Sequence, residues 1–94
     1  MNIEKIIKEN SGTIIDVRTP GEFLSGNVEG SINIPLNEIP DRVMELKSLD
    51  TPILLCCASG ARSQRAFQYL SGQGLNCLNI GSWLNVNYYQ SQAV

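Results

Sequence analysis

The sequence lacks histidine altogether and has only three cysteines. Histidine is the commonest partner of cysteine in zinc sites, so its absence removes the usual protein ligand set for that metal. The cysteines follow no Cys-x-x-Cys spacing, and their odd number gives no disulfide framework. We therefore expect free thiols in a reducing compartment, with neither a metal site nor a cofactor.

The chain also lacks an excess of basic charge and a long hydrophobic run. Its formal net charge of −2 and its pI near 4.9 argue against general attraction to nucleic acid or to an acidic membrane surface. Charged residues interrupt the apolar ones after Met1, so neither a secretory signal nor an apolar span of roughly 18 residues is predicted. We expect a cytoplasmic protein without nucleic-acid or membrane partners.

The size and composition of the chain bound its organisation. With 94 residues it has room for one small domain, and we expect residues 1–94 to form it. Hydrophobic residues make up 43% of the chain and charged residues 17%, values typical of a folded protein rather than a disordered one. A globular core is therefore expected.

Patterns typical of helices and strands alternate along the chain. Thr19 followed by Pro20 predicts the start of a short helix that ends at Gly26. The apolar run 52–57 is typical of a central parallel strand buried on both faces. The other predicted strands are 13–17, 31–35 and 75–80. Further helices are predicted over 2–9 and 62–72. Another helix is predicted from Leu36 through roughly Lys47, with Pro40 near its first turn. This order predicts an α/β fold with a central parallel sheet flanked by helices on both faces, while the tail from about Asn85 is expected to be partly loose.

The segment LCCASGARSQR, residues 55–65, places two adjacent cysteines where an apolar strand gives way to very small residues. Ligands of an open parallel sheet bind beyond the carboxyl ends of its strands, and Cys57 lies at such an end. Small residues allow backbone N–H groups to turn toward one point, and the following helix adds its positive dipole end. The loop therefore predicts an anion-binding site around the sulfur of Cys57. The groups concerned belong to Ala58, Ser59, Gly60, Ala61, Arg62 and Ser63.

Two arginines stand near the start of this helix, where a cation is unfavourable by up to about 1 kcal/mol. Arg62 and Arg65 share one side of the helix, so we expect an anion, either a substrate or the Cys57 thiolate, to offset their charge. The loop amides, the dipole and the guanidinium should lower the pKa of Cys57 from about 8.5 into the range of roughly 3.5 to 7.5 known for activated cysteines. Cys57 is the predicted nucleophile, and it needs no histidine base.

A buried structural role is the alternative for each cysteine. A structural thiol at Cys57 would not require a loop of small residues with an arginine after it. Strand alternation points Cys56 away from Cys57, so we interpret Cys56 as a core residue. Cys77 lies within an apolar run and has the same interpretation. A resolving role for Cys56 or Cys77 stays open as a lesser alternative.

Several separated segments carry a resemblance to a known family. They are IDVRTPGEF (15–23), GNVEGSINIPL (26–36) and ILLCCASGARS (53–63), followed by Ala66 and by GSW (81–83). In order and spacing, from about residue 12 to residue 83, they resemble the single-domain rhodaneses, which are sulfurtransferases. The resemblance implies a small rhodanese-like α/β domain in which Cys57 is the active cysteine.

The resemblance also implies a mechanism. Cys57 would take the outer sulfur of thiosulfate or another persulfide donor, hold it as a persulfide, and pass it to a thiol or to cyanide. The loop amides from Ala58 to Ser63 would hold the persulfide, and Arg62 would assist an anionic donor. Asp16 and Arg18 match the family's Asp-Val-Arg segment, and we interpret them as a structural ion pair or loop clamp.

The loop length favours sulfur transfer over phosphate chemistry. Four residues separate Cys57 from Arg62, as in sulfur-transferring rhodaneses, whereas related cysteine phosphatases have five. Asn27 and Cys56 depart from the family, which often has histidine and an aromatic residue at these positions. Three alternatives stay open: a non-catalytic binding or regulatory module, a thiol phosphatase or arsenate reductase, and a redox sensor using both adjacent cysteines. The oligomeric state is left open.

Overall fold

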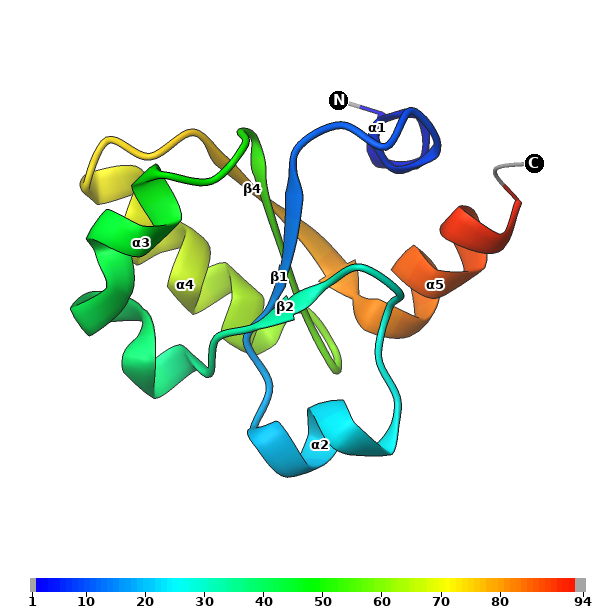
Figure 1. Cartoon of the computed structure of the whole chain (residues 1–94), viewed down its shortest axis with the longest axis horizontal. Helices are drawn as coiled ribbons and strands as arrows, with labels where there is room; N and C mark the ends of the chain where they lie inside the picture. The colour runs from blue at the N-terminus through cyan, green and yellow to red at the C-terminus, as the bar shows by residue number, and fades with distance from the viewer. Residues whose placement is uncertain (1, 93–94) are drawn as a thin grey trace.

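A computed structural model describes residues 2–92 and has a four-stranded sheet at its centre (Figure 1). The strand order is β2–β1–β3–β4, and every neighbouring pair is parallel. The predicted parallel sheet is confirmed. Its strands are β1 (Thr13–Asp16), β2 (Ile32–Asn33), β3 (Ile53–Cys57) and β4 (Cys77–Ser82).

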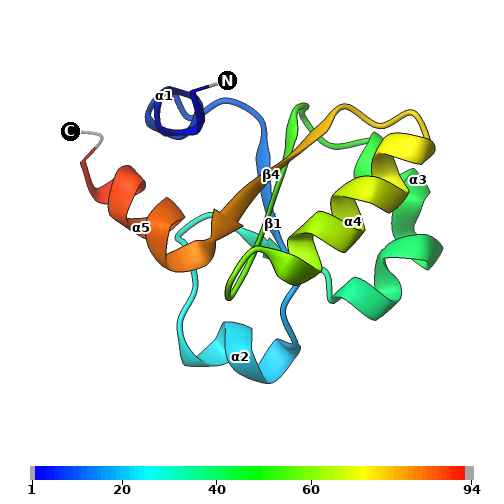
Figure 2. The same cartoon turned by 180° about the vertical axis from the view of Figure 1, so that it is seen from behind.

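Helices cover both faces of the sheet, as the sequence predicted. The 3-10 helix η1 (Leu36–Arg42), α3 (Val43–Lys47) and α4 (Ala61–Gly72) lie on one face, and α1 (Ile3–Lys8) and α5 (Trp83–Ser91) on the other (Figures 1 and 2). The short helix α2 (Pro20–Ser25) follows β1 and lies at the carboxyl end of the strands, at the same end as the turn after β3. This end of the sheet is where a parallel sheet binds its ligands.

The central strand β3 divides the hydrophobic core into two clusters. All five of its residues are buried, as expected for a strand covered on both faces. Ile53, Leu55 and Cys57 belong to the cluster beneath α3 and α4, whereas Leu54 and Cys56 belong to the cluster beneath α1 and α5. The two adjacent cysteines therefore face opposite sides of the sheet, because successive strand residues point in opposite directions.

The predicted continuous helix from Leu36 to Lys47 is wrong in detail. The chain forms the 3-10 helix η1 up to Arg42 and only then the α-helix α3. Pro40 explains the difference, because proline has no N–H to donate and its ring clashes with the carbonyl four residues earlier in an α-helix. The apolar pattern nevertheless placed Ile39 and Leu46 correctly, since both are buried.

The end of the chain also differs from its prediction. The last strand starts and ends two residues later than expected, and the tail that we expected to be partly loose from Asn85 forms α5. The Ser82 hydroxyl caps this helix by accepting a hydrogen bond from the Leu84 amide at 3.2 Å, and Val86 is fully buried. The sequence of α5 shows no clear apolar periodicity, because Val86 is its only buried residue and most of the others are asparagine, glutamine, serine or tyrosine.

Candidate active site

The loop after β3 closes around the sulfur of Cys57. Gly60 adopts a left-handed conformation (φ 99°) that places its N–H 3.0 Å from Cys57 Sγ. The Ser63 amide donates to the same sulfur at 3.4 Å, and the Ser63 hydroxyl lies 3.3 Å from it. Ala58, Ser59 and Ala61 form the exposed rim of the loop. The loop thus brings hydrogen-bond donors together at one sulfur, as the spacing of small residues predicted.

The two adjacent thiols have opposite pKa shifts. Burial opposes ionisation of Cys57, but hydrogen bonds from the Ser63 hydroxyl and from the Ser63, Gly60 and Ser59 amides outweigh it and lower the pKa of Cys57. Burial raises the pKa of Cys56 to about 12, and the negative charge of Asp16 adds to this effect. Cys57 is therefore the thiol that ionises more readily, and Cys56 is a core residue.

Arg62 forms an ion pair that the sequence did not predict. Its guanidinium donates two hydrogen bonds, of 2.7 and 3.0 Å, to the carboxylate of Glu22 on α2. This pairing lowers the pKa of Glu22 to about 2, so the carboxylate is charged at neutral pH. Glu22 therefore offsets much of the charge of Arg62. Hydrogen bonds of the loop lower the pKa of Cys57, and the charges of Cys57 and the Arg62 guanidinium also attract each other, as we expected.

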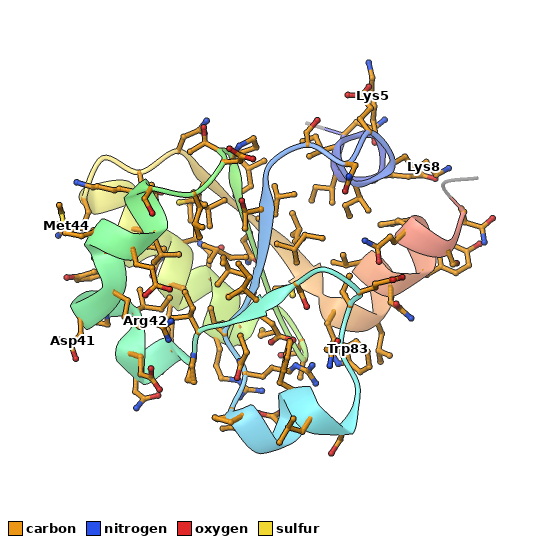
Figure 3. All side chains as sticks on the ribbon, viewed as in Figure 1. Lys5, Lys8, Asp41, Arg42, Met44 and Trp83 are labelled. Carbon is orange, nitrogen blue, oxygen red and sulfur yellow. The ribbon has the colours of Figure 1, made fainter. Side chains whose placement is uncertain are left out.

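Asp16 and Arg18 form a buried ion pair beneath the loop that leads to α2. Arg18 Nη2 lies 2.7 Å from Asp16 Oδ2, and Arg18 Nε donates to both carboxylate oxygens. The same guanidinium donates to the backbone oxygens of Gly26 at 2.6 Å and Glu22 at 3.3 Å. It also lies against the ring of Trp83, 4.5 Å from its centroid. The predicted ion pair and loop clamp are both present, and Trp83 lies beside the segment that leaves α2 (Figure 3).

A family model described as "Rhodanese-like domain" matches residues 2–87. The chain belongs to the rhodanese-like family.

Individual relatives agree with this assignment. The chain is 43% identical over 61 residues to the uncharacterized protein YqhL of Bacillus subtilis, a match that covers 65% of this chain and 48% of YqhL. It is 31% identical over 70 residues to the thiosulfate sulfurtransferase GlpE of Ectopseudomonas mendocina, covering 74% of this chain and 63% of GlpE. The chain thus spans only about half to two thirds of these relatives. A rhodanese-related protein from Thermoplasma volcanium has a similar structure, with a TM-score of 0.79, 30% identity, and coverage of 94% of this chain and 88% of that one.

Asn79 of this rhodanese-like domain also contacts the Cys57 loop, although the sequence did not single it out. Its side-chain oxygen accepts hydrogen bonds from the Ser63 hydroxyl at 2.7 Å and the Gly81 amide at 3.0 Å. Its side-chain nitrogen donates to the backbone oxygen of Gly60 at 3.1 Å and to Gln64 at 3.0 Å. Asn79 therefore ties β4 to Gly60 and Ser63, two of the residues that donate to Cys57. The available signal was a polar residue between Leu78 and Ile80 in an apolar strand.

A β-bulge places Asn79 beside the loop. Leu55 of β3 pairs with Asn79, but the next residue, Cys56, pairs with Gly81, so Ile80 is an extra residue in β4. A bulge of this kind redirects side chains at the end of a strand. Gly81 adopts a positive φ of 85° there, which favours glycine.

The remaining predicted residues take no part in the hydrogen bonds to Cys57. Within residues 2–92, the Arg65 guanidinium is not engaged in a salt bridge, and Arg65 lines a pocket beside the loop. Cys77 is buried beneath α4, with its sulfur 3.5 Å from the Ser71 hydroxyl. The part of the chain that the structure describes has no group of three or more histidine, cysteine, aspartate or glutamate residues suited to a metal ion. None of its helices is both long and apolar enough to span a membrane.

Proposed function

We propose that this rhodanese-like domain is a sulfurtransferase that carries sulfane sulfur as a persulfide on Cys57. The observation that carries this proposal is the convergence of the Gly60 amide, the Ser63 amide and the Ser63 hydroxyl on Cys57 Sγ, at 3.0 to 3.4 Å. These groups stabilise the thiolate, which is the nucleophilic form of cysteine. A relative named thiosulfate sulfurtransferase supports the same reaction class.

The first half of the reaction loads Cys57. The thiolate attacks the outer sulfur of thiosulfate, a new S–S bond forms, and the S–S bond of the donor breaks as sulfite leaves with its electron pair. Another persulfide donor reacts in the same way and leaves as a thiolate. No oxidant is needed, because the transferred sulfur is already sulfane sulfur in the donor and stays at the same oxidation level in the Cys57 persulfide.

The second half empties the site. A thiolate or cyanide attacks the outer sulfur of the persulfide, and the electron pair of the breaking S–S bond returns to Cys57 Sγ. The amides of Ala61 and Arg62 lie in the first turn of α4, where N–H groups have no partner within the helix. We assign them to stabilising the charge of the outer sulfur, together with the Ser59 amide of the rim. The same amides therefore serve both halves of the reaction.

Access to the sulfur and the pairing of Arg62 bear on the choice of donor. The Cys57 side chain has no exposed surface, so a donor reaches Sγ only when groups of the surrounding loop move aside. The charge of Arg62 is already neutralised by Glu22, so thiosulfate must compete with that carboxylate for it. The second feature favours a persulfide donor whose binding does not depend on Arg62 over free thiosulfate.

Turnover with cyanide tests the proposal. Wild-type protein supplied with thiosulfate or glutathione persulfide, plus cyanide, should form thiocyanate faster than the same mixture without protein, and Cys57→Ser should reduce the rate to that of the uncatalysed reaction. Cys56→Ser should retain it, because Cys56 faces the other side of the sheet. A rate above the uncatalysed one with folded Cys57→Ser, or no rate above it with folded wild-type protein and either donor, would refute the proposal, and the latter result would favour a non-catalytic module.

A further inference from the structure

A pocket of about 510 Å³ lies next to the Cys57 loop but does not contain the sulfur. It is enclosed by the segments that follow β1 and β2 and by one face of α4, so it opens at the same end of the sheet as the loop. Arg62 lines the pocket and also follows the loop directly, which makes it the point where the two sites meet. The pocket and the loop together can accommodate a molecule larger than thiosulfate or cyanide.

The wall of the pocket is mainly apolar. Val17 and Ala66 form part of it and belong to the same buried cluster as Cys57. The further apolar residues of the wall include Leu36, Ile39 and Pro40. Sulfite, thiosulfate and cyanide are small and strongly hydrated, and they gain nothing from such a wall. An organic molecule with an apolar body does, at about 25 cal/mol for each Å² that it removes from water.

The charge at the pocket is positive. None of its lining residues within the described part of the chain is acidic, and two are arginines. Arg62 is engaged by Glu22, whereas Arg65, one helical turn further on, makes no salt bridge within residues 2–92. A guanidinium beside an apolar wall is complementary to a carboxylate on an apolar chain, since the fork of N–H groups matches two carboxylate oxygens.

We propose that this pocket binds the sulfur acceptor, and that the acceptor is an organic thiol with an apolar body and a carboxylate that Arg65 recognises. This inference rests on the proposed sulfurtransferase function. The acceptor thiolate attacks the outer sulfur of the Cys57 persulfide, forming an S–S bond of its own. The bond between that sulfur and Cys57 breaks, and its electron pair restores the Cys57 thiolate. Because the sulfur lies outside the pocket, the acceptor needs a chain long enough to extend from Arg65 to the loop.

Three acceptor thiols test separately whether the pocket requires a carboxylate and whether it requires a long apolar chain. Mercaptohexanoate has both the carboxylate and the apolar chain, mercaptohexanol has the chain without the charge, and mercaptoacetate has the charge without the chain. With a loaded persulfide, kcat/KM should be highest for mercaptohexanoate, by about tenfold over mercaptohexanol, the size expected for one charge-assisted contact. In Arg65→Gln the ratio of the two hexyl thiols should fall toward one. Rates are compared at equal thiolate concentration.

A matched variant controls for net charge. Lys8→Gln removes one positive charge on α1, across the sheet from the pocket, and should leave the ratio at its wild-type value (Figure 3). Equal kcat/KM for the two hexyl thiols in wild-type protein, or a ratio that Arg65→Gln does not change, would overturn the inference. If thiocyanate still forms from cyanide in that case, the sulfurtransferase function stands and only the acceptor assignment fails. If thiocyanate does not form either, both fail.

Discussion

The hydroxyl of Ser63 has a single proton and three acceptors within reach. The backbone oxygen of Gly60 lies 3.1 Å away, Asn79 Oδ1 2.7 Å and Cys57 Sγ 3.3 Å. The Asn79 side chain is held in one orientation, because its oxygen accepts from the Gly81 amide while its nitrogen donates to Gly60 and Gln64. Asn79 therefore positions the loop and competes with the thiolate for the Ser63 proton.

Asn79→Asp should raise the pKa of Cys57. The new carboxylate adds a negative charge near the thiolate and accepts the Ser63 proton more strongly, and both effects disfavour the charged sulfur. The pH dependence of alkylation by iodoacetamide, with Cys57 identified by peptide mass, should shift to a higher midpoint than in wild-type protein. Asn76→Asp makes the same charge change at an exposed residue directly before β4 and should leave the midpoint unchanged. A midpoint that stays or falls in Asn79→Asp would contradict this role.

The residues of the site differ in how far the sequence predicts them. Cys57 and its loop amides are local to one segment, and strand alternation alone separates Cys57 from Cys56. Asn79 and Glu22 reach the loop from β4 and α2, through a bulge and an ion pair that join distant parts of the chain. Their positions depend on register and packing, which no local pattern contains.

At the scale of elements, an ion pair joins α2 to α4 across the mouth of the site. Glu22 belongs to the capping box of α2 with Thr19, and the same carboxylate binds Arg62 near the start of α4. The low pKa of Glu22, about 2, keeps the carboxylate charged until the pH falls far below its ordinary value near 4.3, so the pair persists throughout the neutral range. An anionic donor must share Arg62 with this carboxylate.

Glu22→Gln should improve the use of thiosulfate. Glutamine keeps the uncharged part of the capping box but no longer neutralises Arg62, so kcat/KM for thiosulfate should rise roughly three- to tenfold. The rate with glutathione persulfide should change less. Glu45→Gln breaks a comparable surface pair with Arg42 on η1 and serves as the control. A fall in kcat/KM for thiosulfate in Glu22→Gln would show that Glu22 assists the donor instead of competing with it.

The helices and strands that bury the most apolar side chains are the ones whose ends the sequence predicts best. The strand β3 and the helix α4 have strong apolar patterns, and both were predicted to within one residue at each end. The proline inside the predicted helix over 36–47 outweighed a correct apolar pattern, since it prevents α-helical hydrogen bonding. In α5 the periodicity is weak, because Val86 is its only buried residue and Trp83 and Tyr89 are only partly buried.

At the scale of the whole molecule, the sheet separates two hydrophobic clusters that serve different purposes. One contains Cys57 and supports the loop, and the other contains Cys56 and is closed by α1 and α5. Val86 of α5 is fully buried in this second cluster, and Trp83 at the start of α5 covers the Asp16–Arg18 pair. The C-terminal helix therefore contributes to stability and to the clamp beneath the site.

Val86→Ala should destabilise the protein by roughly 1–3 kcal/mol, because it removes buried methyl groups and leaves a cavity. Leu84→Ala is the matched control on the same helix, since Leu84 is 59% exposed and a surface substitution is usually within about 0.5 kcal/mol of neutral. Urea unfolding followed by tryptophan fluorescence measures both. Equal effects of the two substitutions would mean that the tail is loose, as its sequence alone suggested.

The intact mass of the protein after incubation with thiosulfate or glutathione persulfide shows directly whether Cys57 carries the sulfur. Wild-type protein, Cys56→Ser and Cys77→Ser should each gain one sulfur atom that cyanide removes, whereas Cys57→Ser should gain none. Persistence of the added sulfur in Cys57→Ser, or its loss in Cys56→Ser, would contradict the assignment of Cys57 as the sulfur carrier.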